Sequence, residues 1–490
     1  MRGKLVFLLI LAMLVGLVYL VGTRTRDAHV MPRARPEAVV DASEAAPGAP
    51  SASSSSPSTV MPAPSASTSA DARAPLLDRP LRLVASSWEL AAAAYVANGG
   101  RSTTDGSAAQ QAGLELKVDV AASESDIENR LARGGADAEG ADVAVLPLPA
   151  LVASYERLRA LEPQIVHVVA WSRGREVLLG ARDGMLAKPG AAGADVTLVG
   201  SDPSAIALAL FALDEAGTPA AHVHLVTESK SATFAALARP LSPDRPPDAP
   251  SRALVSTAEA TRLVPLVAVV ARGFVEGHAA AMTALLKAWD QGATELRRDV
   301  PAAARRIAAE PGAPEPATLL ERLGWMNDPG RADEGAALGL SSGGSLVPGD
   351  AAVTVGQLFA RDWSLLRDAG ALTSPAPERA PVDASAFAHA FPSLAAAPAP
   401  ATVTAPAESA RTLLAHRIVK GDAASIAASI AGLAGVFERS AVRVTTRPPS
   451  LARDAADGAT ARHVPPGRVV VATAPLADAA AALVEVLAPP

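Results

Sequence analysis

The segment Gly-Ser-Asp-Pro-Ser at residues 200–204 has the residue types of an anion-binding turn. It follows a predicted strand and opens a predicted helix, whose free N–H groups and positive dipole end bind oxyanions. Ser201 and Ser204 are therefore ligand-binding candidates. Serine, aspartate and proline are also ordinary residues of helix N-termini, so a purely capping role is the alternative. Asp202 would repel an anion at this place.

Polar and aromatic residues also follow the apolar run at residues 81–85. Ser86 and Ser87 are candidates for hydrogen bonds to a ligand. Trp88, one of only five tryptophans, is a candidate for the wall of a pocket. Ordinary packing in the core is the alternative for this indole.

Three further places could contribute to the same site. Pro147 ends the predicted strand at residues 142–146. Thr257 could donate a hydrogen bond to a ligand, although a helix cap is the commoner role for such a residue. Arg173 and Arg175 could clamp an anion bidentately, with the solvated end of a strand as the alternative.

Catalytic and metal chemistry have little support in this sequence. The chain has no cysteine, which excludes disulfides, thiolate catalysis and iron–sulfur clusters. It also lacks the H-E-x-x-H, P-loop and G-x-G-x-x-G motifs. His222 and His224 share one face of a predicted strand, which we expect to be an exposed or half-buried face rather than a metal site. We predict no enzyme activity, no cofactor and no metal.

The charge balance excludes another class of partner. The 44 basic and 50 acidic residues give a formal net charge of −6. A general nucleic-acid binder needs a clustered cationic surface, so we expect no nucleic-acid partner.

Strands and helices alternate through the middle of the chain. The predicted strands are at residues 81–85, 114–120, 142–146, 165–170, 176–180, 196–200 and 222–226. The predicted helices are at residues 90–96, 123–132, 204–217, 279–296, 302–309, 317–323 and 355–369, and Ser125 is the expected N-cap of the second. This order is typical of α/β folds with a mostly parallel sheet. Open sheets of this kind bind ligands at the carboxyl ends of their strands, where the candidate residues stand.

The N-terminus predicts attachment to a membrane. Residues 5–22 form an unbroken apolar run, about 27 Å long as a helix, close to the roughly 30 Å of a bilayer core. We expect residues 1–27 to hold an uncleaved transmembrane anchor, with a cleavable signal peptide as the alternative. Residues 28–78, rich in proline, serine and alanine, are predicted to be a disordered linker.

The C-terminal region, residues 396–490, is predicted to be a linker followed by a small α/β domain. Its expected helices are at residues 409–417, 423–437 and 476–487, and its expected strands at 441–446 and 468–473. The order that begins at Lys420-Gly421-Asp422 faintly resembles an OmpA-like domain.

Four stretches together resemble a known family. They are residues 81–89, 141–150, 196–217 and 254–289. In this order they are similar to the periplasmic substrate-binding proteins of ABC importers, in the nitrate/sulfonate/taurine branch that includes thiamine-pyrimidine synthase-like proteins. The resemblance covers about residues 79–395. Five prolines interrupt residues 230–252, where the family has a strand, so this strand is expected to be missing or rebuilt.

The resemblance implies a type II periplasmic-binding-protein fold. Lobe one would comprise about residues 79–170 and 262–395, and lobe two about residues 171–261. A small molecule, expected to be an oxyanion, would bind between them by hinge closure. The implied protein is a single-pass inner-membrane protein with its folded part in the periplasm and an ABC permease as a possible partner. The alternative is a degenerate binding fold that acts as an envelope scaffold or sensor.

Overall fold

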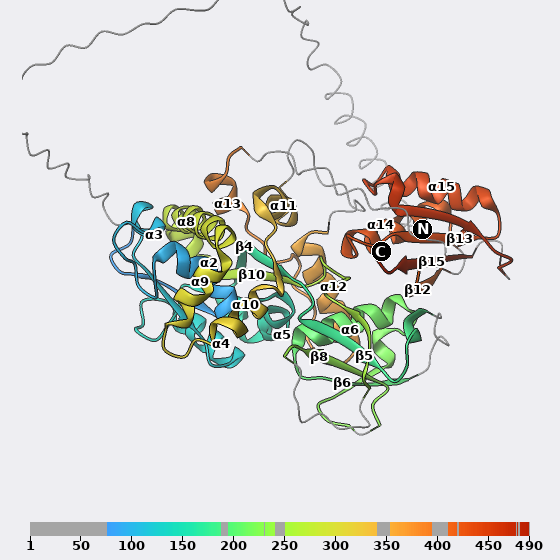
Figure 1. The fold of residues 1–490 in the computed structure, drawn as a ribbon, viewed down its shortest axis with the longest axis horizontal. Helices are drawn as coiled ribbons and strands as arrows, with labels where there is room; N and C mark the ends of the chain where they lie inside the picture. Colours follow the sequence, from blue (N-terminus) through green and yellow to red (C-terminus); the bar gives the residue numbers. More distant parts are fainter. Residues whose placement is uncertain are drawn as a thin grey trace, which may run out of the picture. The chain divides into compact units, whose positions relative to one another are not determined.

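The computed structural model describes residues 76–187, 195–229, 231–240, 250–340, 353–393, 410–418, 421–476, 478 and 481–489. This part of the chain contains three β-sheets with helices packed against them, which confirms the predicted α/β class (Figure 1). The predicted anchor at residues 5–22 lies outside the described residues, as does almost all of the predicted linker before residue 79. Within the described ranges, every helix is too short or too polar to cross a bilayer.

The first sheet has the order β11-β4-β10-β3-β1-β2. Its strands are β1 (Leu81–Ala85), β2 (Leu116–Val120), β3 (Val143–Pro147), β4 (Pro163–Ser172), β10 (Pro265–Ala271) and β11 (Met326–Asn327). Strands β1, β2 and β3 are parallel, and β10 is antiparallel to both β3 and β4. The first four strands therefore run in one direction. The expectation of a mostly parallel sheet was wrong, because the chain returns to this sheet as β10 and runs against them.

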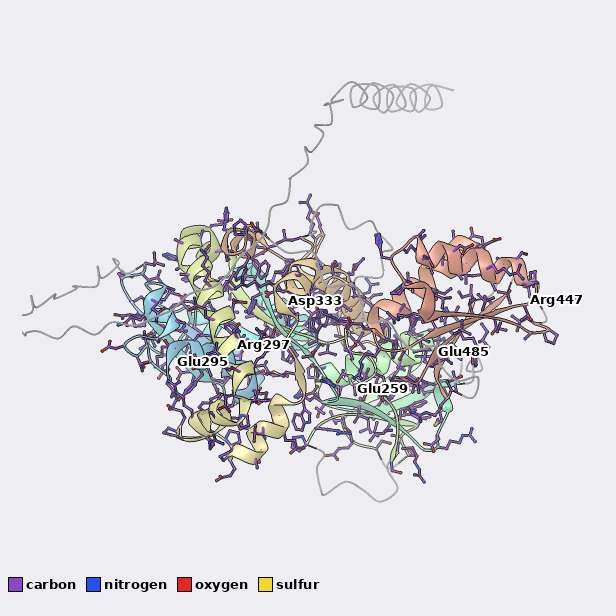
Figure 2. The ribbon with its side chains drawn as sticks, turned by 45° about the horizontal axis from the view of Figure 1, so that its top comes forward. Glu259, Glu295, Arg297, Asp333, Arg447 and Glu485 are labelled. Carbon is purple, nitrogen blue, oxygen red and sulfur yellow. The ribbon has the colours of Figure 1, made fainter. Side chains whose placement is uncertain are left out.

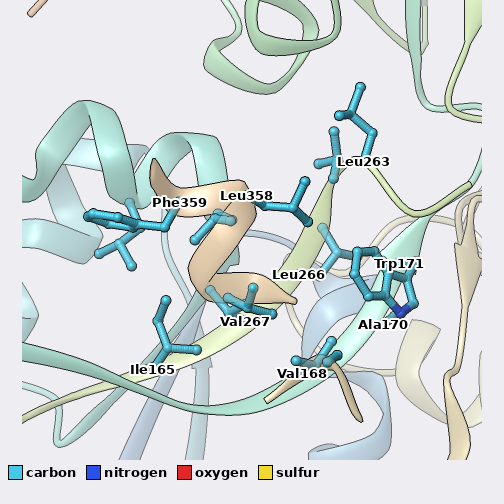
Figure 3. Close-up of a cluster of buried hydrophobic side chains, with 14 of the residues drawn as sticks. Ile165, Val168, Ala170, Trp171, Leu263, Leu266, Val267, Leu358 and Phe359 are labelled. Carbon is cyan, nitrogen blue, oxygen red and sulfur yellow. The ribbon is translucent and has the colours of Figure 1, made fainter. Parts of the chain in front are cut away.

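Helices cover this sheet because its central strands are apolar along their whole length. Strand β3 is buried at every position, a pattern typical of a strand with both faces covered. The helices are α2 (Trp88–Asn98), α3 (Ala108–Gln111), α4 (Glu124–Arg133), α5 (Leu148–Leu158), α7 (Arg272–Gly277), α8 (Ala279–Arg298), α9 (Val300–Ala308), α10 (Pro316–Leu323), α11 (Gly330–Ala337), α12 (Val355–Asp368) and α13 (Ser385–Ala390). Figure 3 shows Phe359 of α12 in one apolar cluster with Ile165 of β4 and Val267 of β10.

The N-cap of α4 differs from the prediction. Ser123 caps this helix, and its side chain accepts a hydrogen bond from the backbone N–H of Asp126 at 3.2 Å. The predicted cap, Ser125, is the second residue of the helix and is exposed. The Ser-x-x-Glu pattern pointed to the wrong serine, because the turn that follows β2 already ends at Ser123.

The second sheet has the order β7-β6-β8-β5-β9. Its strands are β5 (Glu176–Gly180), β6 (Val196–Val199), β7 (Val223–Val226), β8 (Phe234–Ala238) and β9 (Arg252–Ser256), and its helix is α6 (Pro203–Glu215). The strand expected to be missing or rebuilt at residues 230–252 is present as β8, paired with β5 and β6. It forms because the apolar run from Phe234 precedes the prolines. Residues 241–249 lie outside the described residues.

The third sheet, near the C-terminus, has the order β12-β15-β13-β14. Its strands are β12 (Thr412–Ile418), β13 (Val442–Thr446), β14 (Val469–Thr473) and β15 (Ala482–Leu487), and its helices are α14 (Ala423–Val436) and α15 (Pro449–Thr460). The segments predicted as the first and last helices of this region are instead the strands β12 and β15. Their alanine and leucine content favours a helix, but antiparallel pairing between them and with β13 overrides that preference.

A buried carboxyl group on α12 makes stability depend on pH. Asp362 is 1% exposed, and burial raises its pKa from 3.8 to about 8, while Arg361 opposes the rise. Between these pH values the folded chain holds a proton that the unfolded chain releases, so stability falls as the pH rises towards 8. We expect Asp362→Asn to raise the thermal midpoint by several degrees at about pH 8.5 and little at about pH 4.5. The exposed Asp368→Asn is the control, and an equal gain at both pH values would contradict the prediction.

Candidate functional site

Four strand ends meet at one edge of the first sheet. Because β1 to β4 run in the same direction, Ser86, Ser123, Pro147 and Ser172 all lie at or just beyond carboxyl ends. A cavity of about 200 Å³ opens here. It is lined by Ser86, Ser87, Glu89, Leu90, Ser123, Glu124, Pro147, Ser172, Arg175, Asp202, Leu266, Arg322, Trp325 and Met326. Most of these residues belong to the first sheet and its helices, and Asp202 follows β6 of the second sheet.

The two segments that join the sheets are bound to each other beside this cavity. The chain leaves the first sheet at Ser172 and returns through residues 257–264. The Oγ1 of Thr257 accepts a hydrogen bond from the N–H of Gly174 at 2.8 Å and donates one to the Oε2 of Glu176 at 3.0 Å. The hydroxyl of Ser172 donates to the same carboxylate. Glu176 is therefore the centre of a network that fixes both crossings between the sheets, at residues 172–176 and 257–264.

Arg175 links this network to the cavity. Its Nη1 lies 2.8 Å from a carboxylate oxygen of Glu176, and its Nη2 lies 3.1 Å from the Oδ2 of Asp202. Burial opposes the charge of this guanidinium, but the two carboxylates outweigh burial and raise its pKa. Arg175 is held by acidic groups of the chain itself, so little of its charge is left for a ligand.

The cavity lining carries more carboxyl groups than guanidinium groups. Glu89, Glu124 and Asp202 face Arg175 and Arg322. Burial raises the pKa of the Glu124 carboxyl, and the neighbouring charge of Asp202 raises it further. Asp202 also caps α6, because its Oδ1 accepts hydrogen bonds from the N–H groups of Ser204 and Ala205, both at 2.9 Å. The positive end of α6 is thus already satisfied.

Three polar atoms around the cavity are buried and lack a hydrogen-bond partner among the described residues. They are the Oγ of Ser87, the Oε2 of Glu89 and the Nε of Arg322. Ser87 is the N-cap of α2, yet its side chain makes no capping hydrogen bond. Buried polar groups are nearly always paired in proteins, so three unpaired ones around one cavity mark it as a place where a ligand or water completes the structure.

A second cavity of about 270 Å³ adjoins the first. The two share Glu89, Leu90 and Met326 in their linings. The second is lined mainly by apolar side chains of α2, α8, α9 and β4. Its lining also includes Arg297 of α8, which Figure 2 labels. Glu89 of α2 thus lines both cavities.

Of the residues proposed from the sequence, four line the main cavity. They are Ser86, Ser87, Pro147 and Arg175. Ser86 is fixed there by its backbone N–H, which donates to the carbonyl of Val145 at 2.9 Å. The rule that pocket residues follow parallel strands accounts for Ser86, Ser87 and Pro147, whereas Arg175 lies in the segment between β4 and β5.

The other five candidates lie elsewhere, and Arg173 among them is exposed. Trp88 packs in a small apolar cluster with α9 and α10, where its Nε1 donates to the carbonyl of Gly312 at 3.0 Å. Ser201 is exposed, Ser204 is buried in the first turn of α6, and Thr257 belongs to the crossing network. Trp88 therefore makes the core contacts of its packing alternative, whereas Thr257 caps no helix in the described part of the chain and Asp202, rather than either serine, caps α6.

Several lining residues were not among the candidates. Ser123 and Glu124 follow β2, so the strand-end rule applied to the second strand would have found them. Glu89 stands two residues after Ser87 and could have been read as a first-turn carboxylate of α2. Arg322 and Trp325 carry no local signal, because only the packing of α10 against α2 and α9 brings them to the cavity.

Other groups with possible chemistry do not form a site. His222 is half-buried and His224 exposed, and their ring nitrogens lie 2.9 and 3.6 Å from the carboxylate of Asp195. Across the described ranges, no group of three or more histidine, aspartate or glutamate side chains could hold a metal ion. Residues 339–343 read Gly-Leu-Ser-Ser-Gly and match the G-x-S-x-G pattern. That pattern needs a strand before its serine, whereas here helix α11 precedes it and residues 341–352 lie outside the described residues.

Comparisons with known proteins find similarity only among solved structures. No family model matches the chain, and no curated protein does. The ligand-binding component of an ABC-type import system from Staphylococcus aureus shares 12% identity with a TM-score of 0.42, over 64% of this chain and 100% of that one. The periplasmic aliphatic sulphonate binding protein SsuA from Escherichia coli shares 13% with a TM-score of 0.37, over 51% and 79%.

A third similar structure is that of an enzyme. The desulfurization enzyme DSZB shares 13% identity with a TM-score of 0.35, over 64% of this chain and 99% of that one. Similarity at these levels is one of fold alone and assigns neither a ligand nor an activity.

Proposed function

We propose that this chain is a periplasmic solute-binding protein, in which two lobes close on a small molecule at the cavity between strand ends. The observation that carries the proposal is the cavity itself. Its wall contains residues from the carboxyl ends of four strands of the first sheet. It also contains Arg175, which lies between β4 and β5, and Asp202, which follows β6 of the second sheet. A ligand bound there would contact both sheets, so its binding energy would favour their approach.

The finer parts of the proposal follow from the sequence resemblance. Residues 5–22 would anchor the chain in the inner membrane, residues 28–78 would act as a tether, and an ABC permease would receive the ligand. Lobe one would comprise about residues 79–170 and 262–395, and lobe two about 171–261. We propose type II closure without a chemical step, and the C-terminal unit as a small interaction or structural domain that is OmpA-like in its element order.

The size of the cavity limits the ligand. Pockets for drug-sized molecules span about 300–1,000 Å³, and this cavity measures about 200 Å³. The ligand is therefore a small molecule rather than a peptide or an oligosaccharide.

A second candidate function is an envelope scaffold or sensor that has lost its ligand. One observation favours it. Arg262, in the second crossing, bonds to Glu438 at 3.0 Å and to Asp333 of α11 at 2.9 Å, and its N–H donates to the carbonyl of Val436 (Figure 2 labels Asp333). The C-terminal unit is thus attached to a segment that hinge closure would have to move.

A thermal-shift screen distinguishes the two functions. The panel contains nitrate, phosphate, small sulfonates, small amines and amino acids. A ligand at a hundred times its Kd stabilises the folded state by about 2.7 kcal/mol, a shift of several degrees. Ser86→Trp fills the cavity and is expected to abolish the shift, whereas the exposed Ser125→Trp leaves it intact. A wild-type midpoint that no member moves would favour the scaffold.

A further inference from the structure

Glu89 is a buried carboxylate that lines both cavities and has an unpaired oxygen. Glu89 is 5% exposed, and its Oε2 is buried without a hydrogen-bond partner in the described part of the chain. The first turn of α2 offers a carboxylate some stabilisation from the helix dipole. That gain does not replace the hydrogen bonds that a buried carboxylate loses when it leaves water.

The basic groups nearby do not neutralise Glu89 by direct contact. Arg175 senses its charge, but the guanidinium of Arg175 makes its ion pairs with Glu176 and Asp202. Glu124, on the same cavity wall, adds a second carboxyl group. In the described part of the chain no cationic group lies within ion-pair distance of Glu89, although Arg322 lines the same cavity and Arg297, which pairs with Asp328, lines the second one.

We propose that Glu89 binds a positively charged nitrogen of the ligand. This inference rests on the proposed function and names its ligand class: a small ammonium or amidinium compound that also carries a hydrogen-bond acceptor. The nitrogen is bound by Glu89, with Glu124 nearby. The acceptor meets the two unpaired donors on the cavity wall, the Nε–H of Arg322 and the hydroxyl of Ser87.

This assignment differs from the oxyanion expected from the sequence resemblance. A simple oxyanion would satisfy Arg322 and Ser87, but it would face Glu89, Glu124 and Asp202 with a like charge. An amine on the same molecule turns that repulsion into a charge-assisted hydrogen bond, which is among the stronger contacts a site offers. The same three unpaired atoms would then all have partners.

The test uses two matched pairs of probes in calorimetric titrations: β-alanine against propanoate, and 2-aminoethanesulfonate against ethanesulfonate. In the wild type we expect the amine-bearing member of at least one pair to bind ten-fold or more tightly than its amine-free partner. Glu89→Gln keeps the shape of the side chain and removes its charge, so it should abolish that preference. The exposed Glu295→Gln is the control and should leave the preference unchanged (Figure 2).

A measurement without ligand guards against a variant that merely unfolds. Because the buried carboxylate is unpaired, Glu89→Gln should raise the thermal midpoint of the free protein. Residues that serve binding often cost stability, so replacing one commonly stabilises the fold. A lowered midpoint would show that Glu89 is structural and would overturn the proposal. So would tighter binding of the amine-free probes, an amine preference that survives Glu89→Gln, or no binding of either amine probe. The proposed function is decided separately, by the Ser86→Trp variant in the broader panel.

Discussion

Replacing Arg468 with alanine is expected to destabilise the C-terminal unit, residues 410–489, by about 3–5 kcal/mol, because it leaves buried backbone carbonyls without their donor. Arg468 is 4% exposed. Its guanidinium donates to the carbonyls of Ala434, Phe437 and Ser440, at 2.7 to 3.1 Å. These carbonyls lie at the end of α14 and just beyond it, where the helix leaves its last acceptors unpaired.

The size of this effect follows from the burial of the group. Desolvation lowers the pKa of Arg468, and the nearby charge of Glu438 opposes that change. Without the guanidinium, the carbonyls of Ala434 and Ser440 would lose their donor while buried, whereas that of Phe437 would keep the N–H of Ser440 at 2.9 Å. A buried acceptor left without a donor is more damaging than the loss of the bonds themselves. Hydrogen exchange should show loss of protection in α14, β13 and β15. The exposed Arg453→Ala is the matched control, and equal protection in both variants would contradict this account.

Replacing Glu176 with alanine is expected to loosen both crossings, with a loss of about 3–5 kcal/mol because it breaks a buried charged network. Glu176 is fully buried and is bound by Arg175, Ser172 and Thr257. Removing it leaves Arg175 with Asp202 alone and leaves the hydroxyl groups of Ser172 and Thr257 with only each other, 3.4 Å apart, as a side-chain partner. The amide of Gly174, which donates to Thr257, should then exchange faster with solvent.

Variants of graded severity separate charge from hydrogen bonding at this position. Glu176→Gln keeps an acceptor for the two hydroxyl groups and should have an intermediate effect. The exposed Glu276→Ala changes the same residue type away from the crossings and should have little effect. If Glu176→Ala melts at the wild-type temperature with a protected Gly174 amide, the network does not hold the crossings.

Much of the α/β pattern was predictable, because local signals were strong. Alternation predicted β2, and the Gly-Ser-Asp-Pro-Ser turn at residues 200–204 predicted the start of α6. The same reasoning failed for β12 and β15, where alanine-rich segments pair with each other across some seventy residues of sequence. No local pattern encodes that pairing, and no pattern indicated that β10 would run antiparallel.

The candidate site was predictable only in part, for a related reason. Ser86, Ser87 and Pro147 follow directly from the geometry of parallel strands. Glu89 and Arg322 gain their significance from burial without a partner, which exists only once α10 has packed beside α2. The charge balance of the cavity, and with it the class of ligand, could therefore not be derived from the residues around one strand end.

The central claim is that a small molecule occupies the cavity at the carboxyl ends of β1 to β4. Native mass spectrometry of the purified protein after exposure to a cell extract tests it most directly. The account predicts that wild-type protein and Ser125→Trp carry an added small-molecule mass, and that Ser86→Trp carries none. A molecule that stays bound to Ser86→Trp, or a wild-type protein that takes up nothing, would contradict it.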